Sequence, residues 1–297
     1  MNPQHQQTRI NQSKNLLNKE EKKGSFLMEK VKQSDFRMSI LASGSTGNSV
    51  YVETDRIKIL VDAGLSGKKI ENLLKSVGRE AKDLDAILVT HEHSDHIKGV
   101  GVLARRYNLP IYANAKTWQA MENKLGKLKT EQKFIFAKEK VLTLADLDIS
   151  SFGVSHDAVD PQFYSFHRNA KSFVILTDTG YVSDRMRGML KNADCYLFES
   201  NHDVELLRYG SYPWHLKQRI LSNKGHLSNE DGALALAEMV GDDTERIYLG
   251  HLSQDNNVKD IARTTAHDIL TEKDCGVNHH FWLYDTDPAE ATTLYTL

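Results

Sequence analysis

The stretch at residues 86–96, AILVTHEHSDH, limits the possible folds of this chain more than any other part of it. Its first five residues are mostly apolar and are bounded by charge, which predicts a buried strand. The strand runs directly into four potential metal ligands, His91, His93, Asp95 and His96. Side chains two residues apart point the same way, so His91 and His93 can bind one ion while Asp95 and His96 turn toward a second. The spacing therefore predicts a site for two metal ions.

The donor atoms of this cluster indicate which metals it suits. Imidazole nitrogen and carboxylate oxygen together favour zinc, manganese or iron over magnesium and calcium, which prefer oxygen ligands alone. The alternative is a solvated polar turn, but three histidines within six residues at the end of a strand are hard to explain as surface residues. We therefore expect two divalent ions, zinc or manganese, as cofactors.

Length and composition limit the class of protein. A chain of 297 residues with 40% hydrophobic content can bury the core of one large α/β domain. The formal net charge of -2 provides no overall field that attracts nucleic acid or membrane, so such binding would need a local patch. Cys195 and Cys275 are the only cysteines and have no ligand-like spacing, which fits a reducing compartment. With no apolar run near the ~18 residues of a membrane helix and no secretory signal, we expect a cytoplasmic protein without membrane contact.

The two ends of the chain differ in composition. Residues 1–34 are rich in Gln, Asn, Lys and Glu, which predicts a disordered tail, and residues 35–297 are expected to form the folded domain. The first loop of that domain, LASGSTGNS, carries Ser43, Ser45 and Asn48. Such a loop can hold an anion through its backbone N–H groups, or it can be a hairpin turn without a ligand. Composition leaves both interpretations open.

Further candidate ligands follow later strands. His156 follows the strand IDISSFGVS, and Asp178 ends SFVILTDTG in the same manner. A lone histidine at a strand end is usually structural, whereas a carboxylate can bridge two ions, which favours Asp178 as a shared ligand. Asp62, at the end of an earlier strand, is expected to order the neighbouring metal loop rather than to bind metal.

Two GHLS sequences place His226 and His251 where a loop enters a helix. Only one of these histidines is needed as the last metal ligand, and the pattern alone does not choose between them. Asn229 is expected to cap the helix that follows the first GHLS sequence. Glu199 lies on another predicted buried strand, DCYLFES.

Taken in order, the segments LASGSTGNS, THEHSDH, FGVSHDA, LTDTGYVSD, FESNHD, KGHLSN and YLGHLS resemble the YycJ group of metallo-β-lactamase-fold proteins, also called WalJ or VicX. The resemblance extends from about Met38 to the C-terminus. It implies an α/β fold, a four-layer αββα sandwich in a single domain, with the metals at its open edge. It also implies a hydrolase that acts as a 5′ to 3′ exonuclease on DNA.

The resemblance also implies roles for individual residues. The superfamily pattern assigns His91, His93 and His156 to the first metal, Asp95, His96 and His251 to the second, and Asp178 to both. The KGHLSN histidine is similar to a non-ligand histidine of tRNase Z nucleases, which implies that His226 is a proton donor supported by Glu199. The implied catalytic residues are thus Asp95, His226 and Glu199, and the candidate substrate contacts are Ser43, Ser45, Asn48 and Ser228.

Two functions remain as hypotheses. In the first, a metal-bridging hydroxide attacks a DNA phosphodiester, and basic pairs at Lys68-Lys69, Arg105-Arg106 and Arg185/Arg187 follow the phosphates, unless these pairs are simply solvated helix faces. In the second, the same fold is a small-molecule hydrolase, either a cyclic phosphodiesterase or an ester or thioester hydrolase. The near-zero net charge and the absence of an inserted nucleic-acid-binding domain motivate this second hypothesis, which is the alternative to the first.

Overall fold

Alternating side chains in the first strands produce two buried surfaces on one sheet. In β1 (Arg37–Ala42), Met38 and Ile40 belong to one apolar cluster and Leu41 to another, because successive strand residues point to opposite faces. The computed structural model describes residues 35–297, and Phe36–Leu297 form one compact unit. The predicted tail at residues 1–34 lies outside the described residues.

The first sheet takes its strands from the N-terminal half of this unit and from the C-terminus. Its order is β14-β1-β2-β3-β4-β5-β6, antiparallel from β14 to β3 and parallel from β3 to β6. The strands are β1 (Arg37–Ala42), β2 (Ser49–Glu53), β3 (Lys58–Val61), β4 (Ala86–Leu88), β5 (Ile111–Ala113), β6 (Lys133–Ile135) and β14 (Tyr295–Thr296).

The second sheet, like the first, combines an antiparallel half with a parallel half. Its order is β13-β12-β11-β10-β9-β8-β7, antiparallel from β7 to β10 and parallel from β10 to β13. The strands are β7 (Val141–Leu144), β8 (Leu147–Gly153), β9 (Gln162–Arg168), β10 (Lys171–Leu176), β11 (Cys195–Glu199), β12 (Arg246–Gly250) and β13 (Trp282–Asp285).

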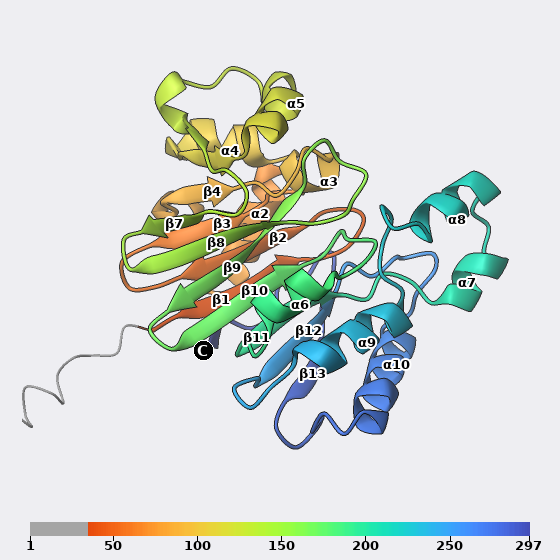
Figure 1. Ribbon diagram of the computed structural model, residues 1–297. Coiled ribbons are helices and arrows are strands. Elements are labelled where there is room, and N and C mark those ends of the chain that lie inside the picture. Colours follow the sequence, from red (N-terminus) through yellow and green to blue (C-terminus); the bar gives the residue numbers. More distant parts are fainter. Residues whose placement is uncertain (1–34) are drawn as a thin grey trace, which may run out of the picture. The chain divides into compact units, whose positions relative to one another are not determined.

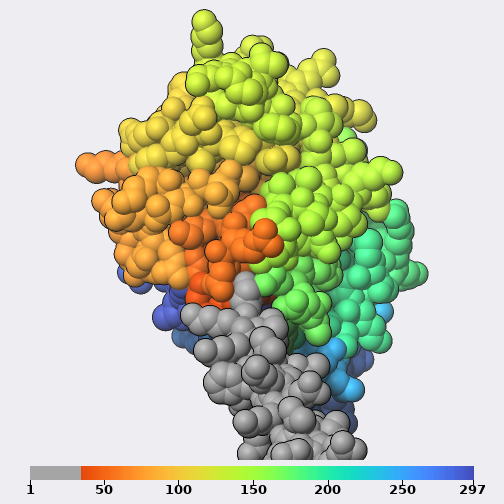
Figure 2. Space-filling model, turned by 90° about the vertical axis from the view of Figure 1, so that its left-hand side faces the viewer, coloured from red at the N-terminus to blue at the C-terminus, as the bar shows by residue number. Residues whose placement is uncertain are grey.

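Helices cover the outer face of each sheet, so the predicted αββα sandwich is confirmed (Figure 1). α2, α4 and α5 bury apolar residues against the first sheet, and α6, α9 and α10 against the second. The helices are α2 (Gly67–Ser76), α3 (Ser94–Ile97), α4 (Val100–Tyr107), α5 (Ala115–Leu125), α6 (Asp184–Leu190), α7 (Val204–Tyr209), α8 (Trp214–Ile220), α9 (Asn229–Met239) and α10 (Lys259–Glu272), with 3-10 turns at Ala81–Asp83 and Thr130–Gln132. From the side, the orange and yellow segments adjoin the green middle part of the chain (Figure 2).

Some local expectations need correction. Ser228, and not Asn229, caps α9, because the Ser228 hydroxyl accepts a hydrogen bond from the backbone N–H of Asp231 at 3.0 Å. The sequence patterns do not predict β9, although its aromatic residues are buried, nor the two-residue β14. Both cysteines are free, Cys195 buried and Cys275 half-buried. Within residues 35–297, none of the helices has the length and apolarity needed to cross a bilayer.

Candidate metal centre

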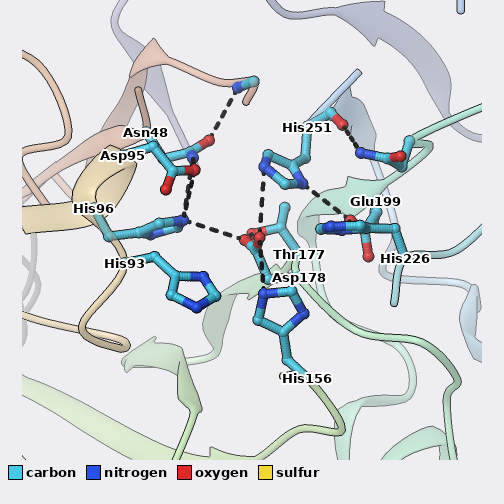
Figure 3. A network of polar contacts seen from close by, with 12 residues as sticks. Asn48, His93, Asp95, His96, His156, Thr177, Asp178, Glu199, His226 and His251 are labelled. Carbon is cyan, nitrogen blue, oxygen red and sulfur yellow. Dashed lines mark hydrogen bonds and ion pairs between the residues drawn. The ribbon is translucent and has the colours of Figure 1, made fainter. Parts of the chain in front are cut away.

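The candidate site lies where strands of both sheets end. The ends of β4, β8, β10 and β12 deliver His91, His156, Asp178 and His251, and Figure 3 shows side chains from these loops directed toward Asp178. The carboxyl ends of neighbouring parallel strands meet at one edge of a sheet, where α/β proteins commonly bind ligands. Residues far apart in the sequence thereby become neighbours at this edge.

Asp178 is at the centre of this arrangement. Its carboxylate oxygens lie 3.5 Å from His96 Nε2, 3.8 Å from His156 Nε2 and 3.4 Å from His251 Nε2. Burial alone raises the pKa of Asp178, but the surrounding imidazoles outweigh it and hold the pKa well below its usual range. Asp178 is therefore an ionised, buried carboxylate within reach of ligand groups on both sides.

The first group of potential ligands is His91, His93 and His156, whose nitrogens all lie within 4.8 Å of one another. His91 Nε2 is 3.1 Å from His93 Nδ1. Burial lowers the pKa of His91 well below its usual value and also lowers that of His156. Imidazoles with lowered pKa values are neutral at physiological pH, which is the form that binds metal.

The second group is Asp95, His96 and His251. His251 Nε2 is buried but makes no hydrogen bond, although such an atom normally has a partner. Burial alone lowers the pKa of His96 and of His251, but Asp178 and other nearby carboxylates raise them to about 10 and about 9. A divalent cation would supply the missing partner of His251, so the residues present fit a metal.

Asp62 orders the metal loop, as predicted. It accepts hydrogen bonds from the backbone N–H of Thr90 at 2.9 Å and from the Thr90 hydroxyl at 2.7 Å, and it lies 2.8 Å from His96 Nδ1. These contacts direct His96 Nε2 toward Asp178. Carboxylates that bind the second nitrogen of a ligand histidine in this way fix its orientation.

Three residues of this region have a left-handed backbone that side chains other than glycine rarely adopt. The φ angles are 57° for Asp62, 50° for Asp178 and 56° for His251. Asp62 and His251 directly follow the last residue of a strand, and Asp178 lies two residues after the end of β10. Strained backbone of this kind clusters at functional sites, but only the folded chain reveals it.

Glu199 connects two histidines at the edge of the centre. Its Oε1 lies 2.7 Å from His226 Nδ1 and 3.0 Å from His251 Nδ1. Burial alone raises the pKa of Glu199, but His226 and His251 lower it to about 2. An ionised carboxylate only accepts hydrogen bonds, so both Nδ1 atoms donate to it. His226 also lines a cavity of about 190 Å³.

The four candidate substrate contacts are placed differently. The buried Ser43 hydroxyl accepts from the backbone N–H of His251 at 2.8 Å, and Asn48 Oδ1 accepts from the backbone N–H of Gly44 at 2.9 Å. Ser228 is buried at the start of α9, as described above. Of the four, only Ser45 is exposed, and it lines the cavity beside His226.

Most of the basic pairs are engaged within the protein. Arg106 pairs with Glu71, Arg185 with Glu139, and Arg187 with Glu238 at 3.1 Å. Arg105 donates to the carbonyl oxygen of Leu125 at 2.5 Å. These charges thus have partners on neighbouring elements, and the expectation that they follow phosphates stays a prediction.

Two residues near the centre are not among the sequence-based candidates. Asn201 Nδ2 donates to the carbonyl oxygen of His251 at 2.8 Å and so holds the strained His251 backbone. His202 is buried, and its Nε2 makes no hydrogen bond. Burial lowers the pKa of His202 to about 4. The tripeptide Asn-His-Asp, which begins two residues after the end of β11, is the signal that could have identified both.

The comparisons with known proteins agree with this geometry. A profile described as a beta-lactamase superfamily domain matches residues 58–252. The chain is 63% identical to "Exodeoxyribonuclease WalJ" of Streptococcus pneumoniae (strain D39), a match that covers 87% of this chain and 97% of that protein. It is 57% identical to "Exodeoxyribonuclease YycJ" of Bacillus anthracis, over 86% of this chain and 97% of that protein.

A solved structure supports the fold at much lower sequence identity. The metallo-beta-lactamase fold protein YhfI of Bacillus subtilis superimposes with a TM-score of 0.67 at 18% identity, over 87% of this chain and 99% of that one. The motifs, the sandwich and the relatives thus agree. The chain belongs to the metallo-β-lactamase superfamily and, within it, to the WalJ/YycJ family.

Proposed function

We propose that this chain is a metal-dependent exodeoxyribonuclease that degrades DNA from the 5′ end. The observation that carries the proposal is the central position of Asp178 between two groups of potential ligands. The support for the substrate is the 63% identity, over 97% of its length, to a protein named an exodeoxyribonuclease. Low-identity relatives of the same fold do not carry a substrate assignment.

In this proposal two divalent ions, zinc or manganese, are held by the residues of the centre. His91, His93 and His156 hold the first, Asp95, His96 and His251 hold the second, and Asp178 contributes to both. The ions supply Lewis acidity that stabilises charge on a phosphodiester and lowers the pKa of water. Asp95 is half-buried and lines an open cavity with Lys98, so this ligand can be reached from the surface.

The chain's own acid–base group in this proposal is His226. Glu199 accepts a hydrogen bond from His226 Nδ1, which leaves Nε2 to carry the proton that the leaving oxygen needs. The side chain of His226 is 20% exposed, whereas that of Glu199 is fully buried. The buried carboxylate thus fixes the orientation of the imidazole, and the imidazole itself lines the cavity.

Duplex DNA labelled at either end tests the activity and its polarity. With Mn²⁺ or Zn²⁺, the protein should release labelled mononucleotides at once from a 5′-labelled strand and only late from a 3′-labelled strand. Activity should fall steeply with added salt, because phosphate contacts release counterions. No nucleotide release with either metal contradicts the proposal, and an early 3′ signal contradicts the polarity alone.

A further inference from the structure

The helices α7 and α8 extend away from the two sheets (Figure 1) and carry two unusually exposed aromatic side chains. Tyr209, the last residue of α7, is 84% exposed, and Trp214, the first residue of α8, is 66% exposed. These are the two highest values for large hydrophobic residues among residues 35–297. The two side chains thus stand at the two ends of one turn, and both are largely exposed to solvent.

The turn between these helices is held firmly. The Lys217 side chain is largely buried, and its Nζ donates to the carbonyl oxygens of Arg208 at 2.8 Å and Gly210 at 2.7 Å. The Tyr212 hydroxyl donates to Asp255 Oδ2 at 2.7 Å. The backbone that carries Tyr209 and Trp214 is thus fixed, and a fixed surface loses little entropy when it binds a ligand.

The charge of this segment differs from that of the whole chain. Residues 204–224 contain four basic residues and one acidic residue, Glu205, which gives a net charge of +3 against -2 for the chain. The four basic residues are Arg208, Lys217, Arg219 and Lys224. Arg208 pairs with Glu205 and Arg219 with Asp157, while Lys217 donates to backbone carbonyls, so Lys224 is the basic residue of the segment for which no ion pair is described within residues 35–297. A local positive charge beside aromatic side chains is the combination that binds single-stranded nucleic acid without sequence preference.

The segment is also continuous with the candidate metal centre. Tyr212, Leu216 and Arg219 line the cavity of about 190 Å³, and His226 and Ser45 form other parts of its wall. One wall of this cavity therefore belongs to α8 and the turn before it, and another wall belongs to the candidate metal centre. A DNA strand whose end occupies the cavity would therefore run along α7 and α8 where it emerges from the cavity.

We propose that the α7–α8 lobe, residues 204–220, is a single-stranded DNA platform on which bases near the cleaved end stack against Trp214 and Tyr209. Lys224, which is exposed beside this lobe, contributes positive charge toward the phosphates. This inference rests on the proposed nuclease function and adds where the strand lies. Every base has a flat aromatic face, so the platform accepts any sequence, as a degrading enzyme requires.

Kinetics on two substrates test the platform. For the metal-loaded Trp214→Ala or Tyr209→Ala protein, KM for a single-stranded oligothymidylate should rise by roughly 5- to 150-fold while kcat stays unchanged. KM for a small nitrophenyl diester should not change, because that substrate is too short to reach the lobe. Trp214→Phe should restore the wild-type KM. Trp282→Ala is the matched control, since Trp282 is 46% exposed and lies on β13, the edge strand of the second sheet.

A binding measurement separates the platform from the catalytic proposal. Phosphorothioate oligothymidylate, which resists cleavage, should quench the tryptophan emission of the wild-type and Trp282→Phe proteins but quench that of Trp214→Phe much less. Equal quenching of Trp214→Phe, or an unchanged KM in both alanine variants of an active enzyme, overturns the platform and leaves the nuclease standing. Quenching by phosphatidylglycerol vesicles in place of oligothymidylate also overturns it, in favour of a membrane surface.

The converse result is equally informative. If the wild-type protein releases no nucleotide yet oligothymidylate quenches Trp214, the proposed nuclease function fails while the platform stands as a nucleic-acid-binding surface. If the protein neither cleaves nor binds oligothymidylate, both proposals are overturned. The variants test binding rather than folding, because both side chains are largely exposed and their removal leaves the core intact.

Discussion

Glu199 is the residue on which two histidines with different proposed roles depend. His251 presents Nε2 to Asp178 at 3.4 Å, whereas His226 meets Glu199 and the cavity. His251→Ala should therefore lower the metal content and abolish activity together. His226→Ala should keep its metal but lose about 10²- to 10⁴-fold in turnover, the usual contribution of general acid catalysis.

The leaving group provides the check on His226. A nitrophenolate departs without a proton, so the defect of His226→Ala should shrink on a nitrophenyl diester. Metal analysis by mass spectrometry and parallel assays on both substrates measure the two effects. Loss of metal from His226→Ala, or equal impairment on both substrates, would show that its role is a different one.

Asp178 is the second residue whose role can be measured directly. Its carboxylate lies within 3.8 Å of ligand nitrogens from both groups, so Asp178→Ala should lose more than one ion per chain. The matched control is Asp160→Ala, which removes a nearby carboxylate that pairs with Lys138 instead. Retention of all bound metal by Asp178→Ala, at the level of the control, would refute a shared ligand.

At the scale of elements, one glycine allows two loops to approach. A Cβ on Gly64 would lie 1.6 Å from the carbonyl oxygen of Asp95, which accepts from the backbone N–H of Asn48 at 2.8 Å. Gly64→Ala should therefore displace the metal loop, cost at least about 1–3 kcal/mol in the free energy of unfolding and reduce metal binding. Urea denaturation and metal titration measure both effects.

Gly188 is the control for this substitution. It lies inside α6, and a Cβ there would meet nothing within 4 Å. Gly188→Ala should stabilise the protein by up to about 1 kcal/mol, because alanine is the better helix former. If both alanine variants bound metal as the wild type does, the close approach of the two loops at Gly64 would not be required for metal binding.

The last residue of β2, an inner strand of the first sheet, is a buried carboxylate with a predictable pH response. Glu53 of β2 lies 2.5 Å from both Arg37 and Arg79, and the Tyr51 hydroxyl donates to it at 2.6 Å. Burial alone raises the pKa of Glu53, but the arginines and Tyr51 outweigh it and lower the pKa below its model-peptide value of 4.5. A lowered pKa means that folding favours the ionised form.

The stability that Glu53 contributes should thus be present above its unfolded pKa and be lost as the pH falls through the folded one. Glu53→Gln should cost about 1–3 kcal/mol at pH 7, with a smaller difference from wild type in strong acid. Asp55→Asn, which removes an exposed partner of Arg37, should cost much less. Urea unfolding at several pH values compares them, and a difference that grows toward acid would reverse the assigned sign.

At the scale of the whole molecule, bound metal would connect the two sheets. His91 and His96 follow β4 of the first sheet, whereas Asp178 and His251 follow β10 and β12 of the second. A metal held at a thousandfold excess over its Kd stabilises the folded state by about 4 kcal/mol, roughly 10 °C in Tm for a domain of this size. Chelation should lower Tm by this order, while Asp178→Ala should respond less; a Tm indifferent to chelator would contradict metal binding between the sheets.

The local pattern of the chain was enough to predict several parts of this architecture. The strand that precedes His91 and the later apolar strands that lead to His156, Asp178 and Glu199 each depend on residues close in sequence. The same applies to Asp178, because a carboxylate that ends a buried strand is recognisable without knowing its neighbours. The resemblance in the order of the motifs then predicted that His156 and His251, which follow strands of the second sheet, belong to the same site.

Only the tertiary structure distinguished residues whose local sequences look alike. His226 and His251 share the GHLS pattern, yet packing of the two sheets places His251 Nε2 beside Asp178 and His226 beside the cavity. Ser43 meets the backbone of His251 across more than two hundred residues of sequence. Hydrogen bonds and ion pairs between distant segments depend on how the layers pack, and hydrophobic periodicity carries no information about which polar groups that packing brings together.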